Sequence, residues 1–445
     1  MPIKIGMVSL GCAKNLVDSE RMLHKIRERG YEIVTESGLA DVVIVNTCGF
    51  IQAAKEEAIE TILELATLKK EGSIRKIILT GCLTERYREE VADEFPEVDA
   101  VVGMGDEAEI LDVIDRALAN TRYVHFAPKA EIPMTGKRVI STLPFFAYLK
   151  IAEGCSNCCT YCAIPMIRGK FRSVSIEDVL EEAAWLTEHG VTELIVVAQD
   201  PTRYGEDLYG ECRLPELLRK LCELPALRWL RILYCYPERI TDELLDVIAT
   251  EPKIVKYMDI PIQHCSGEIL RRMNRQGDEA TLKALLAKIR SRIPDITLRT
   301  TLITGFPGET EADFNTLAEF VQEQKFDHLG CFAYSAEEGT PAAGFSDQIP
   351  EEVRQHRADL LMEQQQTIVE AKHNARIGAV CTAVVEGYDK WAECYFGRTA
   401  ADAPDIDGKV FFHSAEKLTI GTYVTIRLTE VLDYDFVGEV ISACD

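Results

Sequence analysis

The sequence predicts an α/β protein built from three parts. Through most of the chain, apolar strand-like runs alternate with amphipathic helical patterns, which favours parallel sheets covered by helices. From about residue 377 the helical periodicity is lost and polar and apolar residues alternate instead. We therefore expect an N-terminal α/β sheet domain over 1–120, a linker over 121–140, a partial (β/α)6 barrel over 141–372 and a small OB-like β-barrel over 373–445.

The N-terminal domain is predicted from four apolar runs separated by helical patterns. The expected strands are Lys4–Leu10, Asp41–Asn46, Lys76–Thr80 and Asp99–Gly103. The expected helices are Leu16–Arg29, Gln52–Lys69 and Glu85–Phe95. Buried strands linked by amphipathic helices predict one parallel sheet with helices on both faces.

Three cysteines of this domain occupy equivalent positions. Cys12, Cys48 and Cys82 each follow the carboxyl end of an expected strand. Parallel strands bring their carboxyl ends to one edge of a sheet, and ligands bind at that edge. Three buried structural cysteines are the alternative, because cysteine is a common core residue, but the repeated offset favours three thiolates that share an iron–sulfur cluster.

The central domain is predicted from six further strand patterns. They are Phe145–Ala152, Glu193–Ala198, Trp229–Tyr234, Tyr257–Ile262, Thr297–Ile303 and His328–Tyr334. The helical patterns that follow are Ile176–His189, Leu214–Cys222, Asp242–Ala249, Glu279–Ser291 and Glu311–Glu323. Such repeated units predict a partial barrel with reactive groups on the loops at the strand carboxyl ends. A long helix from Glu351 to about Arg376 is expected to lead into the C-terminal barrel.

The loop after the first of these strands carries the pattern C-x3-C-x2-C. Cys155, Cys159 and Cys162 would hold three irons of a 4Fe-4S cluster and leave the fourth iron open, with Cys158 as a spare thiol. Two zinc-type C-x2-C pairs are the rival interpretation. Zinc sites usually separate such pairs by about a dozen residues or more, whereas the pairs here adjoin. The pattern favours redox chemistry at an open iron.

Composition limits the cellular location and the partners that we expect for the protein. Fifteen cysteines, an odd number, with no export signal argue against a disulfide framework and favour a reducing, cytoplasmic location. No apolar run approaches the roughly eighteen residues of a membrane helix. The formal charge of −24 repels phosphate backbones and attracts basic partners.

Five motifs and the C-terminal part together resemble the radical S-adenosylmethionine (SAM) methylthiotransferase family. The residues from Gly11 to Glu20 resemble its first cysteine motif, and Asn46-Thr-Cys48 and Thr80-Gly-Cys82 resemble the second and third. The Cys155 loop is similar to the radical SAM loop, Thr301 to Thr310 resembles the late Gly-rich strand end, and the C-terminal part resembles a TRAM domain.

The resemblance implies two 4Fe-4S clusters and SAM as cofactors. SAM would bind the open iron of the Cys155, Cys159 and Cys162 cluster and be cleaved by one electron, and the Cys12, Cys48 and Cys82 cluster would carry the sulfur.

We expect Tyr161, Gly305 and Gly308 to line the SAM pocket, since glycine lets a backbone approach a ligand closely. A tight turn at the glycines and plain packing of Tyr161 are equally plausible. The residues identify no acid, base or nucleophile as a catalytic group.

Within the family, the chain is most similar to members that methylthiolate the β-carbon of an aspartate in ribosomal protein S-twelve. A sister activity on an adenosine of tRNA is the alternative. Residues 372–445 carry seven Lys/Arg against twelve Asp/Glu, which makes tRNA an unfavourable partner and suits a basic ribosomal protein. The chemistry implies an electron donor such as flavodoxin or ferredoxin. A non-catalytic iron–sulfur carrier is the other class considered, but carriers generally supply four protein ligands to a cluster.

Overall fold

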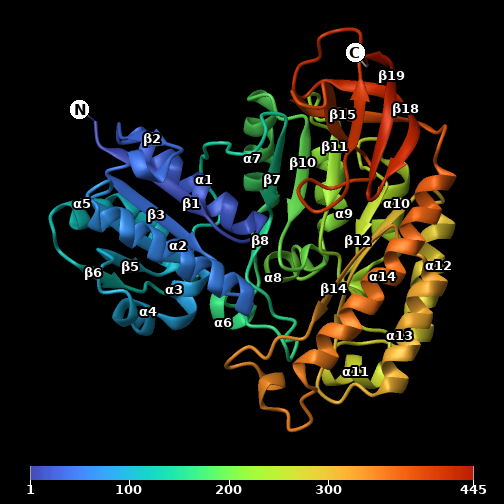
Figure 1. Ribbon diagram of the computed structural model, residues 1–445, viewed down its shortest axis with the longest axis horizontal. Helices are drawn as coiled ribbons and strands as arrows, with labels where there is room; N and C mark the ends of the chain where they lie inside the picture. Colours follow the sequence, from blue (N-terminus) through green and yellow to red (C-terminus); the bar gives the residue numbers. More distant parts are fainter. Residues whose placement is uncertain (1, 444–445) are drawn as a thin grey trace.

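The computed structural model describes residues 2–443, and its N-terminal domain is built on one parallel sheet (Figure 1). The strand order is β2-β1-β3-β4-β5-β6, and every neighbouring pair is parallel. The strands are β1 (Lys4–Ser9), β2 (Glu32–Val34), β3 (Val42–Thr47), β4 (Lys76–Gly81), β5 (Ala100–Val102) and β6 (Tyr123–His125). The helices are α1 (Ala13–Glu28), α2 (Gln52–Lys70), α3 (Cys82–Tyr87), α4 (Glu89–Glu94) and α5 (Ile110–Leu118).

Alternate residues of β3 show how both faces of this sheet are covered. Val42 and Ile44 pack with α1 and α5 on one face. Val43 and Val45 pack with α2, α3 and α4 on the other. Successive side chains of a strand point to opposite faces, so an uninterrupted apolar run buries both. The predicted parallel sheet with helices on both faces is confirmed.

Three details of this domain differ from the sequence prediction. The edge strands β2 and β6 were not expected, since three residues are too few for a periodic pattern to stand out. β6 pairs in parallel with β5, so the sheet continues into the segment expected as a linker. The helix predicted over 85–95 is divided at Arg88, whose φ of 43° is incompatible with a continuous helix.

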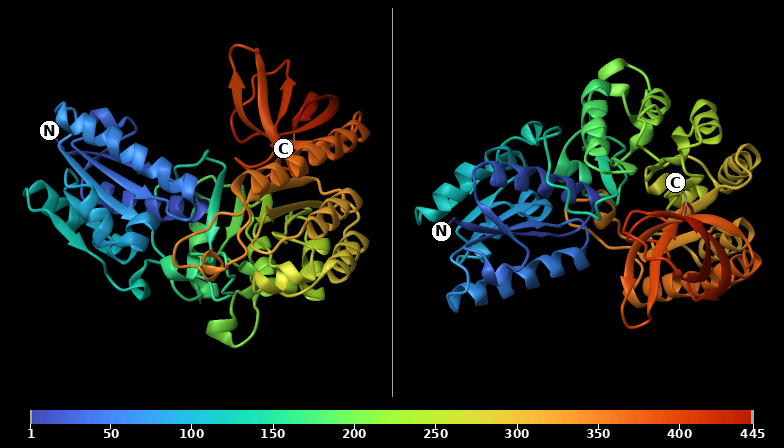
Figure 2. Two further views of the ribbon diagram at one scale, coloured as in Figure 1. Left: turned by 60° about the horizontal axis from the view of Figure 1, so that its bottom comes forward. Right: turned by 90° about the horizontal axis from the view of Figure 1, so that it is seen from above.

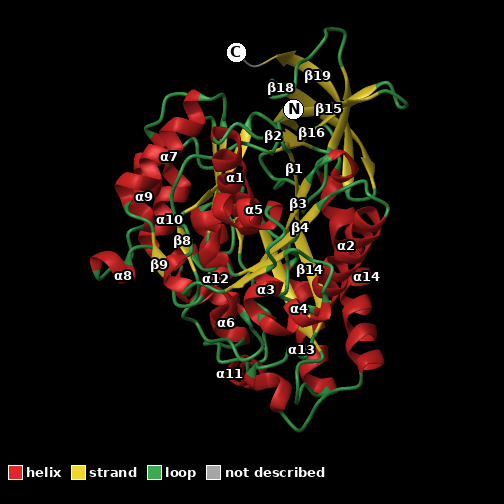
Figure 3. Cartoon of the chain, turned by 90° about the vertical axis from the view of Figure 1, so that its left-hand side faces the viewer, coloured by secondary structure: helices red, strands yellow, loops and turns green. Residues whose placement is uncertain are grey.

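The central domain has the six parallel strands that the sequence predicts. β7 (Phe146–Lys150), β10 (Glu193–Val197) and β11 (Trp229–Ile232) form one sheet, and β12 (Tyr257–Asp259), β13 (Thr297–Thr304) and β14 (His328–Ala333) form the next. A parallel bridge between Leu230 and Ile254 lies where the two sheets meet. Outer helices cover the strands: α7 (Ile176–Glu188), α9 (Leu214–Cys222), α10 (Asp242–Thr250), α12 (Glu279–Arg292) and α13 (Glu311–Gln324). Figure 3 shows α7, α9 and α10 along one outer edge of the molecule, and Figure 1 shows α12 and α13 along another.

The C-terminal domain is a closed barrel of order β15-β16-β17-β19-β18. Its strands are β15 (Val380–Asp389), β16 (Cys394–Thr399), β17 (Val410–His413), β18 (Tyr423–Leu432) and β19 (Asp435–Ala443). The helix α14 (Glu351–Ala375) carries the chain back along the central domain to reach it (Figure 1). The predicted small barrel is confirmed.

The two outer domains contact different parts of the central one (Figure 2). The C-terminal barrel packs against the amino ends of the central strands, where Glu193 accepts hydrogen bonds from Arg231 and Arg398. The N-terminal domain bridges the open side of the barrel. Its α1 lies along β7, and its Lys55 and Arg86 pair with Glu337, just beyond β14. The carboxyl ends of the strands are therefore left for the site.

Candidate cysteine centres at the barrel mouth

The loop that carries Cys155, Cys159 and Cys162 follows the short strand β8 (Ala152–Glu153) and leads into α6 (Ile164–Arg168). Its backbone is anchored from several sides. The N–H of Cys155 donates to Gly169 O at 3.1 Å, and the N–H and hydroxyl of Thr160 donate to Met273 O and Arg272 O. Asn274 Nδ2 donates to Cys158 O at 2.9 Å. These hydrogen bonds fix the path of the loop.

The three thiols of this loop lie close enough to influence one another's ionisation, and Arg203 and Arg275 are cations near them. Burial raises the pKa of Cys155 to about 11 and that of Cys162 to about 12, and the Cys159 thiolate adds to both shifts. Cys159 Sγ lies 3.0 Å from Tyr236 OH. Cys158 is exposed, with its Sγ 3.7 Å from Ser156 O, as expected for a spare thiol. Such thiols are protonated at neutral pH and become thiolates when a metal binds.

Cys12, Cys48 and Cys82 come together from three strand ends. They follow β1, β3 and β4 respectively, and these strands are neighbours in the sheet. A β-carbon on Gly11 would lie 2.9 Å from Cys48 Sγ, and one on Gly49 would lie 2.7 Å from Leu83 Cα. Glycine at both positions is therefore what allows the three loops to approach so closely.

The electrostatics of these three thiols differ from those of the Cys155 loop. Burial, opposed by the charge of Arg168 and aided by the Cys12 and Cys48 thiolates, raises the pKa of Cys82 to about 12. At Cys12 burial also raises the pKa, but Lys14, Arg168 and backbone N–H groups at the start of α1 outweigh it, so the net pKa is lowered. Cys12 nevertheless stays accessible to solvent, so its loss of hydration is partial, whereas Cys48 and Cys82 are buried.

The segments that carry the two groups of thiols are in contact. Cys82 packs in one apolar cluster with Ala163, which directly follows Cys162, and with Ile167 of α6. On the other flank, Lys14 Nζ lies 3.9 Å from the ring centroid of Tyr234, beyond β11. Both groups are thus at the carboxyl ends of parallel strands, where α/β proteins bind their ligands.

Arg168 links the two groups through a buried polar network. Its Nη1 donates to Asp18 Oδ2 at 3.2 Å and to Glu153 Oε2 at 2.9 Å. Its Nη2 donates to Asn15 Oδ1, which also accepts a hydrogen bond from Cys82 Sγ at 3.5 Å.

Lys150 completes the network by donating to Asp18 and to Glu153. Burial opposes ionisation of Glu153, but Arg168 and Lys150 outweigh it and hold the pKa of this carboxyl well below its usual value. Because buried charges need partners, this network fixes α1 against β8 and α6.

A cavity of about 770 Å³ opens beside the thiols, between the N-terminal domain and the ends of β13 and β14. Tyr161 and Gln263 line its floor, and Phe50 and Ile51 line it from the N-terminal domain. Glu337 is at its rim, held by Arg86 at 2.8 Å and Lys55 at 3.2 Å. This volume is typical of a small-molecule site.

Only one of the three residues predicted to line the SAM pocket lines this cavity. Tyr161 lines the cavity, and its ring meets Phe306 edge-on. Gly305 and Gly308 do not line it. A β-carbon on Gly305 would collide with Arg354 of α14, and one on Gly308 would lie 2.6 Å from Asp347 Oδ2. Both glycines have positive φ and make room for neighbouring protein atoms, and their place in the SAM pocket stays a prediction.

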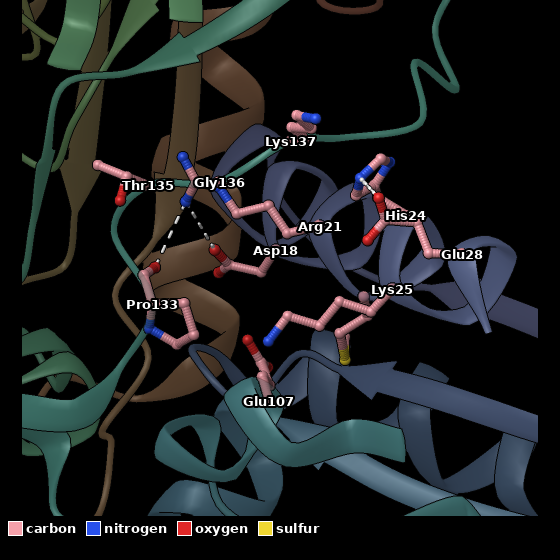
Figure 4. Close-up of a pocket in the computed structure, with 11 residues that line it drawn as sticks. Asp18, Arg21, His24, Lys25, Glu28, Glu107, Pro133, Thr135, Gly136 and Lys137 are labelled. Atoms are coloured by element: carbon pink, nitrogen blue, oxygen red, sulfur yellow. Dashed lines mark hydrogen bonds and ion pairs between the residues drawn. The ribbon is translucent and has the colours of Figure 1, made fainter.

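A smaller cavity of about 330 Å³ lies between α1 and the segment 133–137 (Figure 4). Arg21 points across it to Pro133 O and lies 4.0 Å from Asp18 Oδ1. His24 pairs with Glu28 at 3.2 Å. Its charged groups thus mostly pair with one another, and it carries no further role.

The donor set fits iron–sulfur clusters better than a single metal ion. Within residues 2–443, no group of three or more His, Cys, Asp or Glu side chains is arranged so that it could hold a single metal ion. Each group nevertheless offers three thiols, the ligands that iron–sulfur clusters take, on loops that converge.

Within residues 2–443, no helix is long and apolar enough to span a membrane.

Sequence reasoning missed the residues that surround the thiols. Arg168, Lys150 and Glu153 are charged residues in apolar surroundings, and Tyr236 and Arg275 come from distant loops. The one available signal was a charged residue inside or beside a buried strand, as at Lys150 and Glu153, since charges are rarely buried unless paired.

Comparison with known proteins agrees with this architecture. The family described as "Uncharacterized protein family UPF0004" matches residues 4–103, the "Radical SAM superfamily" matches 149–321 and the "TRAM domain" matches 377–441. Two radical SAM structures are similar in fold at low identity. TsrM, a methyltransferase from Kitasatospora setae, is 12% identical, with a TM-score of 0.57 over 77% of this chain and 74% of its own. OxsB is 13% identical, with a TM-score of 0.52 over 83% and 56%.

Curated relatives match almost end to end. Proteins named "Ribosomal protein uS12 methylthiotransferase RimO" are 49% identical in Lachnoclostridium phytofermentans, over 98% of this chain and 99% of the relative, and 48% identical in Geobacter sulfurreducens, over 99% of each. At such identity and coverage, with all three domains matched in order, the chain belongs to the RimO family of radical SAM methylthiotransferases.

Proposed function

We propose that this enzyme methylthiolates the β-carbon of an aspartate in ribosomal protein S-twelve of the small ribosomal subunit. The names of its relatives support this substrate. The observation that carries the proposal is that both cysteine-bearing segments border one cavity, through Tyr161 beside Cys162 and through Phe50 two residues after Cys48. One group suits the cleavage of SAM and the other suits a sulfur carrier, and the reaction needs both.

In this proposal Cys155, Cys159 and Cys162 hold one 4Fe-4S cluster, and Cys12, Cys48 and Cys82 hold a second. Three thiolates leave one iron of each cluster open. When bound, the clusters and SAM supply the radical chemistry and the sulfur that no side chain of the protein can provide.

The chain's own residues position and shield the reaction. Tyr161 lines the cavity next to the Cys159 and Cys162 thiols, and burial and these thiolates raise its pKa, so it stays a neutral hydrogen-bond donor. Phe50 and Ile51 cover the cavity from the N-terminal domain, which limits the access of water. Arg168 holds the two groups of thiols in a fixed relation through Asn15 and Glu153.

Charge supports a basic protein substrate. The chain carries a net charge of −24, and acidic residues outnumber basic ones in the C-terminal domain. Complementary charge raises the encounter rate with a lysine- and arginine-rich ribosomal protein and opposes binding of tRNA.

The proposal is tested by incubating the reconstituted enzyme anaerobically with SAM, sulfide and dithionite, and with either ribosomal protein S-twelve or unmodified tRNA. Mass spectrometry of the products is expected to find a methylthio group on one aspartate of the protein. A methylthio group on an adenosine of tRNA alone would reverse the assignment of substrate.

A further inference from the structure

A second recess, of about 600 Å³, lies against the loop that carries Cys155, Cys159 and Cys162. It is distinct from the cavity that Tyr161 lines. A single lining residue, Glu238, is a carboxylate. Four lining residues are arginines, namely Arg203, Arg239, Arg271 and Arg275. A basic recess of this kind contrasts with the net charge of −24 of the whole chain.

The carboxylates that pair with these arginines leave the recess itself basic. Arg203 and Arg239 pair with Glu206, Arg239 also lies 3.7 Å from Asp200, and Arg271 pairs with Glu268, but none of these carboxylates lines the recess. Arg275 is buried and its Nη2 lies 3.7 Å from Glu238 Oε2, but its Nε and Nη2 have no hydrogen-bond partner among the described residues. The guanidinium groups thus retain donors for an anionic partner.

The recess also lies very near the thiols. Tyr236, one of its lining residues, has its hydroxyl 3.0 Å from Cys159 Sγ. Asn274, another, donates to the carbonyl of Cys158, and the Cys158 side chain is exposed. A protein docked here is separated from the loop thiols by little more than one side chain.

We propose that this basic recess docks an acidic one-electron donor protein of the flavodoxin or ferredoxin kind. The inference rests on the proposed function, which requires one electron at this loop for each SAM cleaved. One electron leaves the reduced flavin or iron–sulfur group of the donor and enters the centre held by Cys155, Cys159 and Cys162. The donor is oxidised by one electron, the centre is reduced by one, and no bond or proton is exchanged.

A nucleic acid could also pair with arginines, but the position favours an electron donor. Phosphate contacts need no proximity to the thiols, whereas electron transfer does. The remainder of the acidic surface also repels a polyanion that extends beyond the recess. RNA is therefore a competitor in the test.

The test measures the dissociation constant of a purified acidic flavodoxin for the reconstituted full chain at low and high salt. Arg271→Glu is expected to weaken binding about tenfold at low salt, and Glu268→Gln to strengthen it about twofold, because Glu268 neutralises Arg271. Arg239 also lines the recess, and Arg239→Gln is expected to weaken flavodoxin binding about threefold. High salt is expected to reduce all three effects.

Arg219→Glu is the matched control. Arg219 is exposed and pairs with an exposed glutamate, Glu243, as Arg271 does with Glu268, but it lies on α9 outside the recess. Its flavodoxin affinity is expected to stay within about twofold of the unmodified chain. Equal weakening by Arg219→Glu and Arg271→Glu would overturn the proposal, as would a single-stranded RNA that binds more tightly than flavodoxin with the same dependence on Arg271.

Dithionite separates this inference from the proposed function. Cleavage of SAM by the unmodified chain with dithionite tests the function without any donor protein. If dithionite supports cleavage and the recess variants bind flavodoxin normally, the docking surface is wrong and the function stands. If dithionite fails while the variants alter flavodoxin binding as expected, the function is wrong and the docking surface stands.

Discussion

Cys155, Cys159 and Cys162 come from one loop of eight residues, whereas Cys12, Cys48 and Cys82 come from the ends of three strands that are 34 to 36 residues apart in the chain. The loop is fixed by local hydrogen bonds and by its contacts with residues 272–274. The N-terminal group depends on the register of a whole sheet and on glycines that let the loops approach.

Their electrostatics differ as well. At Cys155 and Cys162 burial outweighs the neighbouring charges, so the pKa values of these two thiols rise. The N-terminal thiols share the charge of Arg168, and Cys12 also has Lys14 beside it. The comparison teaches that one centre is defined by local sequence and the other by tertiary structure, so changes to the sheet or to the domain interface should damage the second selectively.

The largest expected effect comes from removing the thiols. Changing Cys155, Cys159 and Cys162 together to Ala is expected to reduce SAM cleavage to background, since the methionine end of SAM then has no iron to bind. Changing Cys12, Cys48 and Cys82 to Ala is expected to leave SAM cleavage with dithionite measurable but abolish methylthio transfer. Chromatography of 5′-deoxyadenosine and mass spectrometry of the substrate measure the two. Cys158→Ala is the control and is expected to retain both.

The next effect in size concerns the interface between the centres. Arg168→Met leaves Asp18 and Glu153 buried with Lys150 as their shared cation and Arg21 4.0 Å from Asp18, and is expected to cost about 3 kcal/mol of unfolding free energy. Denaturant titration measures it. Arg116→Met breaks an exposed pair with Asp112 and is expected to cost under about 1 kcal/mol. Equal losses in the two variants would show that the buried network does not hold the domains together.

A pair of glycines tests whether one centre depends on the sheet and the other on a single loop. Gly81 precedes Cys82 with a φ of 101°, and a β-carbon there would lie 2.5 Å from Thr47 O on the neighbouring strand. Gly81→Ala is expected to cost about 3 kcal/mol and to lose the iron of the N-terminal group alone. Gly154→Ala, beside the other loop, would place a β-carbon 2.7 Å from Gly169 O and is expected to spare the N-terminal iron.

Gly30 provides the control for backbone strain. Its φ is 88°, but a β-carbon there meets nothing within 4 Å. Gly30→Ala is expected to cost about 1–2 kcal/mol and to keep the full iron content. If Gly30→Ala lost as much iron as Gly81→Ala, crowding at the strand ends would not explain the position of the thiols.

The smallest effect is a difference in thiol reactivity with pH. Thiolates are the reactive form, so the lowered pKa of Cys12 keeps more of it reactive at pH 7.5 than Cys155, whose pKa is about 11. In the metal-free protein, iodoacetamide is expected to label Cys12 about tenfold faster than Cys155. Lys14→Met is expected to raise the Cys12 pKa and slow its labelling. Peptide mass spectrometry follows both, and denatured protein, in which the rates should converge, is the control.

The sequence allowed much of the fold to be predicted because long buried strands leave clear patterns. The central strands and the long helix from Glu351 were expected within one or a few residues of where they lie. Short elements such as β2 and β6 were not predicted. The helix break at Arg88 was not predicted either, because nothing in the local sequence requires its positive φ.

The thiols and their surroundings differed in how far they could be predicted. Spacing was enough to group the cysteines, because strand ends and a short loop are both visible in the chain. The network of Arg168 could not be predicted, since its partners Asn15, Asp18 and Glu153 lie up to 153 residues away in sequence. The roles expected of Gly305 and Gly308 depended on the position of Arg354 and Asp347, which pattern alone does not give.

The central claim is that two separate three-thiol centres are present, and anaerobic iron and sulfide analysis tests it most directly. The unmodified, reconstituted chain is expected to bind about eight irons, and each triple Cys→Ala variant about four. The six-fold Cys→Ala variant is expected to bind none. Full iron content in the Cys12, Cys48 and Cys82 variant would contradict the claim, because it would mean that these thiols hold no cluster.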